Sequence, residues 1–211
     1  MKHHILLLVM SVLISALFFT GKADAGLEKG LAAFSNDDYE TALKELAPLA
    51  KKGDTRAQNL LGKIYHFGGP VGRDDRRAVA WFRKAARKGD AKAQLNLGLM
   101  YTEGFGVRID PKEALRWYRK SSAQGNAGAP YRIGEIYATG MLGKRDEEEA
   151  ARWYLKAAER GNPFAMREMA NRYAEGKGVQ KDDQKVEEWN ARALEKSLKA
   201  DEEEKSPYEL Y

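Results

Sequence analysis

The chain has 211 residues, of which 43% are hydrophobic and 32% are charged, and it carries a formal net charge of +5 at pH 7. So mild a basic balance does not by itself identify a nucleic-acid or membrane partner. The absence of cysteine excludes a disulfide framework and any thiolate metal site, so packing alone has to hold the fold together.

The first segment, residues 1–25, has the features of a secretory signal peptide. A positively charged start precedes an apolar run from Ile5 to Phe19, and Ala23 and Ala25 form the small-residue pattern of a cleavage site. The run is shorter than the roughly 20 apolar residues that a membrane-spanning helix needs. We therefore predict a periplasmic or secreted protein with no stable membrane insertion after cleavage. The alternative is an uncleaved anchor.

Residues 26–53 are expected to form a divergent pair of helices. A short apolar signal over 27–34 is followed by a polar break, and apolar residues then recur at helical spacing over 39–49. The first unit of a repeat protein is commonly atypical because one of its sides faces water instead of a neighbouring unit.

A 36-residue repeat follows, without a gap. It is marked by all four tryptophans of the chain and by a glycine before each unit, at Trp81, Trp117, Trp153, Trp189, Gly53, Gly89, Gly125 and Gly161. A fixed period of about 20 to 50 residues is typical of a solenoid. We predict an all-α, right-handed α/α superhelical solenoid with repeats at 54–89, 90–125, 126–161 and 162–197 and a charged tail at 198–211.

Both helices of each repeat begin at a residue that can cap them. The predicted N-caps are Asp54, Asp90, Asn126 and Asn162 for the first helices and Asp74, Asp110, Asp146 and Asp182 for the second helices. The glycine before each first helix supplies the left-handed residue that ends the preceding helix. The turn at 104–106 reads Gly-x-Gly, but it lacks the preceding strand and third glycine of a nucleotide-binding loop.

Glycines inside the first helices, such as Gly98 and Gly134, predict close helix crossings, because glycine costs about 1 kcal/mol against alanine in a helix. In the second helices each tryptophan precedes another aromatic residue or asparagine and then small residues at helical spacing. We therefore expect the tryptophans to lie in the core.

The repeat resembles the Sel1-like repeat, a family of tetratricopeptide-like α/α solenoids. The residues that carry the resemblance are Ala93, Leu97, Gly98, Tyr101 and Gly104, followed by Ala150, Trp153, Ala157, Ala158 and Gly161. The chain departs from the pattern at Pro130, which makes the start of that helix a predicted weak spot, and at Arg172, in an otherwise apolar position. The resemblance implies a non-enzymatic scaffold or adaptor with a protein or peptide partner in the bacterial cell envelope.

A stripe on the first helices that packing does not use is the predicted partner-binding surface. It comprises Asn59, Lys63, His66, Leu95, Leu99, Tyr131, Glu135, Arg167 and Asn171. In the folds that this chain resembles, the stripe lines the concave groove. Its apolar centre and polar flanks suit a peptide or a partner helix. The alternative is that Leu95 and Leu99 pack against a neighbouring helix.

Enzymatic chemistry is not predicted. Only His66 remains as a histidine after residue 25, so we expect no metal site, no cofactor and no serine-histidine catalysis. The minor alternative is a hydrolase that uses Glu135 and Glu175 as a carboxylate pair.

Charge is distributed unevenly along the chain. Segment 51–92 has 12 basic and 4 acidic residues, whereas 182–211 has 5 basic and 10 acidic residues. Solvated helix faces explain this pattern, and the alternative is contact of the basic end with an anionic envelope polymer or with another copy of the chain. Nucleic acid is not an expected partner, and the sequence leaves the oligomeric state open.

The leader provides a direct test. We expect the protein recovered from the envelope fraction to begin at Gly26, as measured by intact mass. A species that retains residues 1–25 would show an anchored protein instead.

Overall fold

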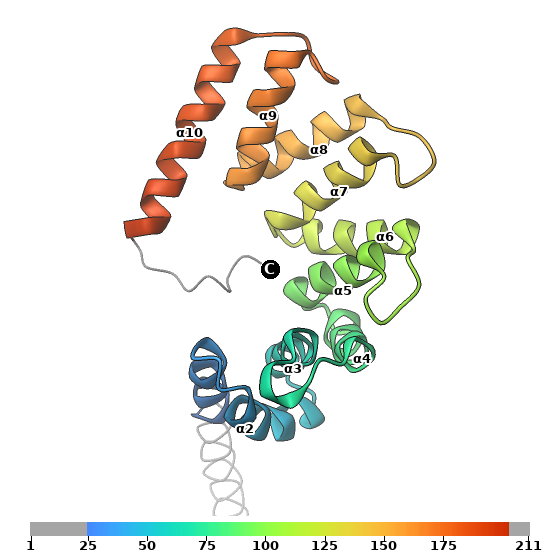
Figure 1. Cartoon of the computed structure of the whole chain (residues 1–211), viewed down its shortest axis with the longest axis vertical. Coiled ribbons are helices and arrows are strands. Elements are labelled where there is room, and N and C mark those ends of the chain that lie inside the picture. The colour runs from blue at the N-terminus through green and yellow to red at the C-terminus, as the bar shows by residue number, and fades with distance from the viewer. Residues whose placement is uncertain (1–24, 203–211) are drawn as a thin grey trace, which may run out of the picture. The chain divides into compact units, whose positions relative to one another are not determined.

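The computed structural model describes residues 25–202, and its regular elements within that range are all helical (Figure 1). Residues 25–35 form the first described helix, and the predicted signal peptide otherwise lies outside the described residues. The elements that follow are α2 (Tyr39–Lys52), α3 (Thr55–Phe67), the 3-10 turn η1 (Gly69–Val71), α4 (Asp75–Arg87), α5 (Ala91–Glu103), α6 (Pro111–Ala123), α7 (Gly128–Thr139), α8 (Glu147–Glu159), α9 (Pro163–Glu175) and α10 (Asp183–Glu202).

The chain divides into two compact units, residues 1–81 and 82–211, and the division falls inside α4. In the second unit, every helix from α5 to α9 packs against the next helix in the chain, so that α9 and α10 lie side by side (Figure 1). This succession confirms the predicted all-α repeat solenoid. The handedness of the superhelix stays a prediction.

The helix boundaries have the predicted caps. Gly89 has a φ of 97°, and the side chain of Asp90 accepts a hydrogen bond from the Ala93 amide at 2.7 Å. The second helices follow the same rule, as where Asp110 accepts from the Glu113 amide at 3.0 Å. These bonds satisfy amides that have no partner inside the helix.

The third repeat begins differently, because Pro130 has no amide hydrogen. In the second repeat the Gln94 amide donates to the Asp90 carbonyl at 2.9 Å, and the Gln94 side chain donates to the Ala86 carbonyl at 3.2 Å. Pro130 occupies the position of Gln94 one repeat later and can make neither bond. The helix accordingly begins at Gly128.

Arg160 supplies both missing donors. Its Nη1 atom donates to the Ser122 carbonyl at 2.7 Å and contacts the Asn126 carbonyl at 3.4 Å. These two carbonyls are the equivalents, 36 residues later, of those of Ala86 and Asp90. The cation also suits the C-terminal end of α6, where the helix dipole is negative. The predicted weak spot is therefore reinforced from the next helix.

Glycine sets the separation of the paired helices. A Cβ atom built on Gly98 would lie 2.4 Å from Cε1 of Tyr118, and one built on Gly134 would lie 2.8 Å from Cδ1 of Tyr154. Any larger residue would push the aromatic ring away. The close crossing that the helical glycines predicted is confirmed at both positions.

The expectation that all four tryptophans belong to the core is correct for two of them and only partly correct for the other two, of which Trp153 packs against the core around Tyr118. Trp117 and Trp189 are buried, but Trp81 and Trp153 are only half-buried. In α4, α6 and α8 the more enclosed position belongs to the next residue, Phe82, Tyr118 or Tyr154, whereas in α10 the next residue, Asn190, is exposed. A tryptophan one residue earlier points about 100° away around the helix, to the edge of the contact.

We expect Gly98→Ala to lower the free energy of unfolding by about 1 to 3 kcal/mol, because overpacking against Tyr118 outweighs the better helix propensity of alanine. Gly128→Ala is the matched control, since a Cβ there would have only ordinary contacts of 3.4 Å or more. Urea unfolding measures both. Equal stability of the two variants would contradict the close-packing account.

We expect Arg160→Ala to cost about 1.5 to 3 kcal/mol, the value of a hydrogen bond to a charged group. Gln124→Ala, at the equivalent position of the preceding repeat, should cost about 1 kcal/mol or less, since Gln124 donates only to the Gln94 side chain. Pro130→Gln should reduce the cost of Arg160→Ala in a double-mutant cycle. Additive effects would show that Arg160 does not replace the donors that Pro130 lacks.

Candidate functional site

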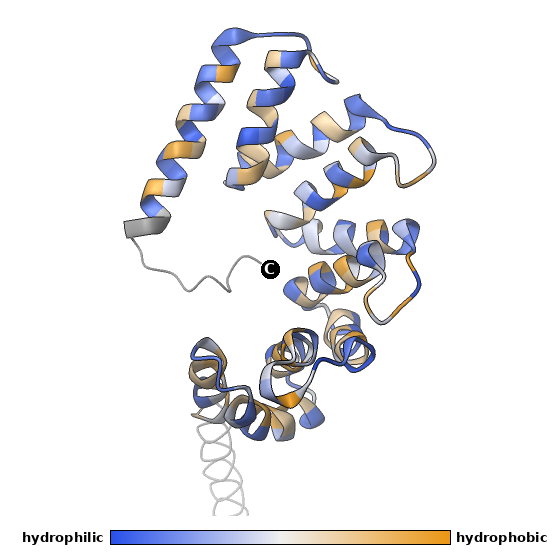
Figure 2. Ribbon diagram, in the orientation of Figure 1, coloured by the Kyte–Doolittle hydropathy of each residue, from blue (hydrophilic) through white to orange (hydrophobic). Residues whose placement is uncertain are grey.

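An apolar pocket of about 230 Å³ lies in the second unit, where the first helices of three successive repeats meet. Its walls are Leu95, Asn96 and Leu99 from α5, Gly128, Tyr131 and Arg132 from α7, and Asn162, Pro163 and Phe164 from α9. The hydrophobic character of α5 is visible in Figure 2. The structure thus brings together the three apolar residues of the predicted stripe, Leu95, Leu99 and Tyr131.

The periodicity of α5 explains why its leucines reach this pocket. Leu97 and Met100 are buried on the face that packs into the solenoid, whereas Leu95 and Leu99 are half-buried and share a neighbouring face. Leu95 also packs against the core around Tyr118. The alternative interpretation of Leu95, as a packing residue, is therefore partly correct, although its side chain still lines the pocket.

Aromatic rings form the opposite wall. The ring of Tyr131 lies 5.4 Å from the ring of Tyr154 and 6.2 Å from that of Phe164, measured between centroids. Phe164 is 48% exposed, although a large apolar side chain gains free energy by leaving water. Burial, together with the nearby Glu135 carboxylate, raises the pKa of Tyr131 to about 12, so its hydroxyl stays protonated at neutral pH.

Sequence reasoning missed Phe164. Its equivalents in the other three repeats are Arg56, Lys92 and Gly128, so an aromatic residue replaces a charged or small one. That departure from the repeat was visible in the sequence. An aromatic residue at a repeat position that is otherwise charged or small indicates an apolar side chain on an exposed face of the helix.

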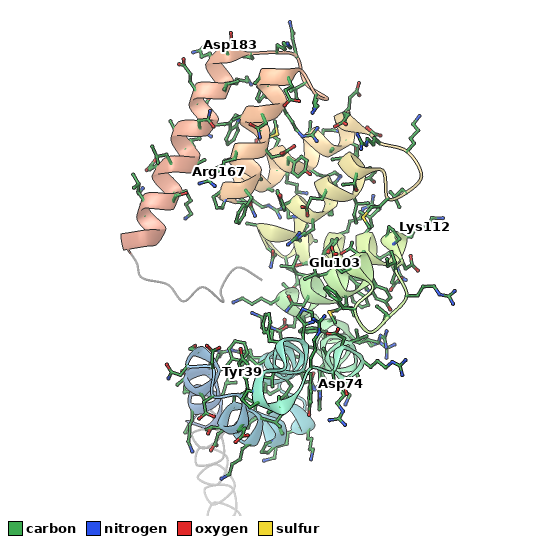
Figure 3. All side chains as sticks on the ribbon, viewed as in Figure 1. Tyr39, Asp74, Glu103, Lys112, Arg167 and Asp183 are labelled. Carbon is green, nitrogen blue, oxygen red and sulfur yellow. The ribbon has the colours of Figure 1, made fainter. Side chains whose placement is uncertain are left out.

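The remaining predicted residues of the second unit lie outside this pocket. Glu135 accepts from Arg132 at 2.9 Å and lines a separate cavity of about 140 Å³. Arg167 and Asn171 are exposed on α9. Arg167, labelled in Figure 3, is on the side of α9 that faces α10, where its Nη2 atom lies 3.4 Å from Oγ of Ser197.

In the first unit, the expectation of open polar residues is wrong for Asn59 and Lys63. They are only 6% and 8% exposed. The Lys63 ammonium lies 6.0 Å from the ring centroid of Phe34, which belongs to the helix of residues 25–35. That helix therefore covers part of the face of α3 that carries Lys63, a face that the sequence pattern predicts to be exposed to solvent.

His66 also has a partner, the carboxylate of Asp75. Its Nδ1 atom lies 2.7 Å from the Asp75 carboxylate, and the His66 side chain is largely buried. Burial favours a higher pKa of Asp75, but hydrogen bonds from Arg73 and His66 outweigh it and hold that pKa below its ordinary value. His66 therefore serves the start of α4 and does not face an open surface.

The two carboxylates of the hydrolase alternative are not brought together. Glu135 pairs with Arg132, and Glu175 pairs with Lys177. The cavity that Glu135 lines is not lined by Glu175. Within residues 25–202, no group of three or more histidine, cysteine or acidic residues could hold a metal ion. The described helices also include none that is long and apolar enough to cross a membrane.

Several residues of the basic segment have local partners. Arg73 pairs with Asp75 at 2.8 Å, and Arg77 pairs with Asp74 at 3.1 Å. In the second unit, Arg83 donates to the Tyr101 hydroxyl at 3.0 Å. The two carboxylate pairs reduce the positive charge that is free to meet an anionic polymer, whereas the hydrogen bond to the Tyr101 hydroxyl leaves the charge of Arg83 in place.

Comparison with family models and solved structures identifies related repeats. The model described as Sel1 repeat matches residues 55–90, 91–126, 128–162 and 163–195. A Sel1 repeat protein from Oxalobacter formigenes is 33% identical over 81% of this chain and 69% of that chain, with a TM-score of 0.72. Comparison with curated proteins gives no match.

Two further structures extend the likeness. A protective antigen of uropathogenic Escherichia coli strains, described as displaying an SLR fold, is 32% identical over 83% of this chain, with a TM-score of 0.74. This chain spans only 38% of that protein's length. A putative Sel1 repeat protein from Klebsiella pneumoniae is 20% identical over 86% of this chain and 90% of that chain, with a TM-score of 0.58, and shows the fold alone.

Proposed function

This chain belongs to the Sel1 repeat family, whose members are generally protein-interaction scaffolds, and from that premise we propose that it is a non-enzymatic scaffold or adaptor of the bacterial cell envelope. Its second unit binds a peptide or a partner helix at the pocket between α5, α7 and α9. The observation that carries this proposal is the exposed Phe164 beside Leu99 and Tyr131, three apolar side chains from three repeats around one cavity.

The size of the pocket favours a side chain over a metabolite. Its volume of about 230 Å³ is below the range of about 300 to 1,000 Å³ that is usual for small-molecule sites. A partner that inserts one large apolar residue would bury Phe164 and Leu99 together. Anchoring by a few apolar or aromatic residues is how most protein interfaces obtain their affinity.

The envelope location is supported by the leader-like sequence of residues 1–25 and by the small-residue pattern at Ala23 and Ala25. A solenoid suits a scaffold there because it presents an extended row of helices to a partner. Its stability does not depend on disulfides, since the chain contains no cysteine.

The double variant Leu99→Glu and Phe164→Glu tests the pocket. Each apolar side chain is worth about 1.5 to 3 kcal/mol when buried by a partner. The pair should therefore weaken partner binding by about 100-fold or more, at 1.4 kcal/mol per factor of ten. Affinity capture from envelope extract, with quantitative mass spectrometry, measures the loss.

Ile109→Glu is the matched control, because Ile109 is an exposed apolar residue of the loop before α6 and does not line the pocket. It should capture the same protein as the wild type. Circular dichroism must show that all variants keep their helical content. A folded double variant that still captures the partner would place the interaction elsewhere.

A further inference from the structure

We propose that residues 207–211 of this chain, Pro-Tyr-Glu-Leu-Tyr, are themselves a ligand of the pocket between α5, α7 and α9 and occupy it in the absence of a partner. This inference rests on the proposed function, because the same pocket serves both. It adds a regulatory element, since an external partner then has to displace a segment of the chain.

The packing of α9 against α10 brings the end of α10 close to the pocket. Oγ of Ser197 lies 3.4 Å from Nη2 of Arg167, and Cε of Lys196 lies 3.9 Å from the place of a Cβ on Gly161. The C-terminal half of α10 thus runs beside the start of α9. The first residues of α9, ending with Phe164, form one wall of the pocket.

The length of chain beyond α10 is sufficient to reach the pocket. From Ser197 to the end of α10 at Glu202 the helix rises about 7.5 Å. The nine residues 203–211 can span about 30 Å when extended. Arg167, which contacts Ser197, is one helical turn from Phe164. Several residues therefore remain to lie along the pocket after the chain has turned back.

The composition of the segment matches the pocket. Residues 201–205 are all charged, whereas Tyr208, Leu210 and Tyr211 are large and apolar or aromatic. In an extended segment, Tyr208 and Leu210 point to the same side, and Pro207 favours extended backbone in the residue before it. A tyrosine ring can pack against the rings of Tyr131 and Phe164, a contact that aromatic pairs favour.

Charge also favours this occupant. Residues 203–211 carry three glutamates and one lysine. The exposed Arg167 lies on the route from α10 to the pocket, whereas Arg132, which lines the pocket, already pairs with Glu135. Opposite charges on the segment and along its path assist docking, although such surface pairs add little affinity each.

A competing apolar surface lies on α10 itself. Leu194 and Leu198 are 61% and 55% exposed and share one face of the helix. Neither lines the pocket between α5, α7 and α9. A segment tethered to α10 could contact these leucines with a shorter loop, so the experiment has to discriminate the two surfaces.

Disulfide trapping does so, because the chain contains no cysteine of its own. One full-length variant carries Leu99→Cys and Leu210→Cys, and the reference variant carries Leu198→Cys and Leu210→Cys. An unbound segment would close the shorter loop to position 198 more readily. We expect the bond between positions 99 and 210 to form at least fivefold faster than the reference bond, within one chain, as measured by mass spectrometry under mild oxidation.

A binding measurement complements the trapping. The probe is a fluorescein-labelled peptide of residues 203–211, titrated by fluorescence anisotropy. The full-length variant Tyr208→Ser, Leu210→Ser and Tyr211→Ser should bind it about tenfold or more tightly than the wild type, whose pocket is already occupied at high effective concentration. Adding Leu99→Glu and Phe164→Glu should abolish binding of the peptide.

The outcomes separate this inference from the proposed function. Faster trapping at position 198, trapping between two chains, or no peptide binding by the serine variant would overturn occupation of the pocket by residues 207–211. The proposed function would still stand if partner capture depended on Leu99 and Phe164. Conversely, trapping at position 99 with unchanged partner capture by the Leu99→Glu and Phe164→Glu variant would leave this inference standing and remove the proposed function.

Discussion

The contact between a helical glycine and an aromatic ring is the interaction on which the repeat depends. Gly98 meets Tyr118 and Gly134 meets Tyr154 at distances that leave no room for a methyl group. Each contact joins the first helix of a repeat to its second helix, and the rings of Tyr118 and Tyr154 are buried in the core. These contacts set the distance between the two helices of a repeat.

Departures from the repeat are compensated by charged residues that lie nearby in the fold. Pro130 removes two donors, and Arg160 provides both. Arg172 takes an apolar position, where its side chain is only 3% exposed, and pairs with Glu147 and Glu168 at 3.0 Å each. Its guanidinium also lies 4.8 Å from the ring centroid of Tyr154. Burying a charge without such partners would be costly, so the partners explain why the substitution is tolerated.

The candidate pocket is formed by residues at positions that vary from repeat to repeat. Glycines, caps and buried aromatics recur because packing requires them, whereas positions such as 95, 99, 131 and 164 differ from repeat to repeat. In the second unit the apolar residues at these positions, Leu95, Leu99, Tyr131 and Phe164, gather around one cavity, whereas Glu135, Arg167 and Asn171 at equivalent positions do not line it. A scaffold can thereby keep its fold while the variable residues determine what it binds.

The sequence by itself determined the helices, their caps and the close crossings, because these depend on residues a few positions apart or on a fixed period. Gly98 and Asp90 could be interpreted without any knowledge of distant contacts, and Leu95, Leu99 and Tyr131 could be placed on one stripe by spacing alone. Only the tertiary structure decided which side chains are exposed to solvent and which are covered by other helices. Asn59 and Lys63 are buried in the first unit, Trp153 lies at the edge of its contact, and Arg160 reaches back to α6. Burial depends on neighbours that are remote in sequence, and a helical period states which face a residue is on but not what covers it.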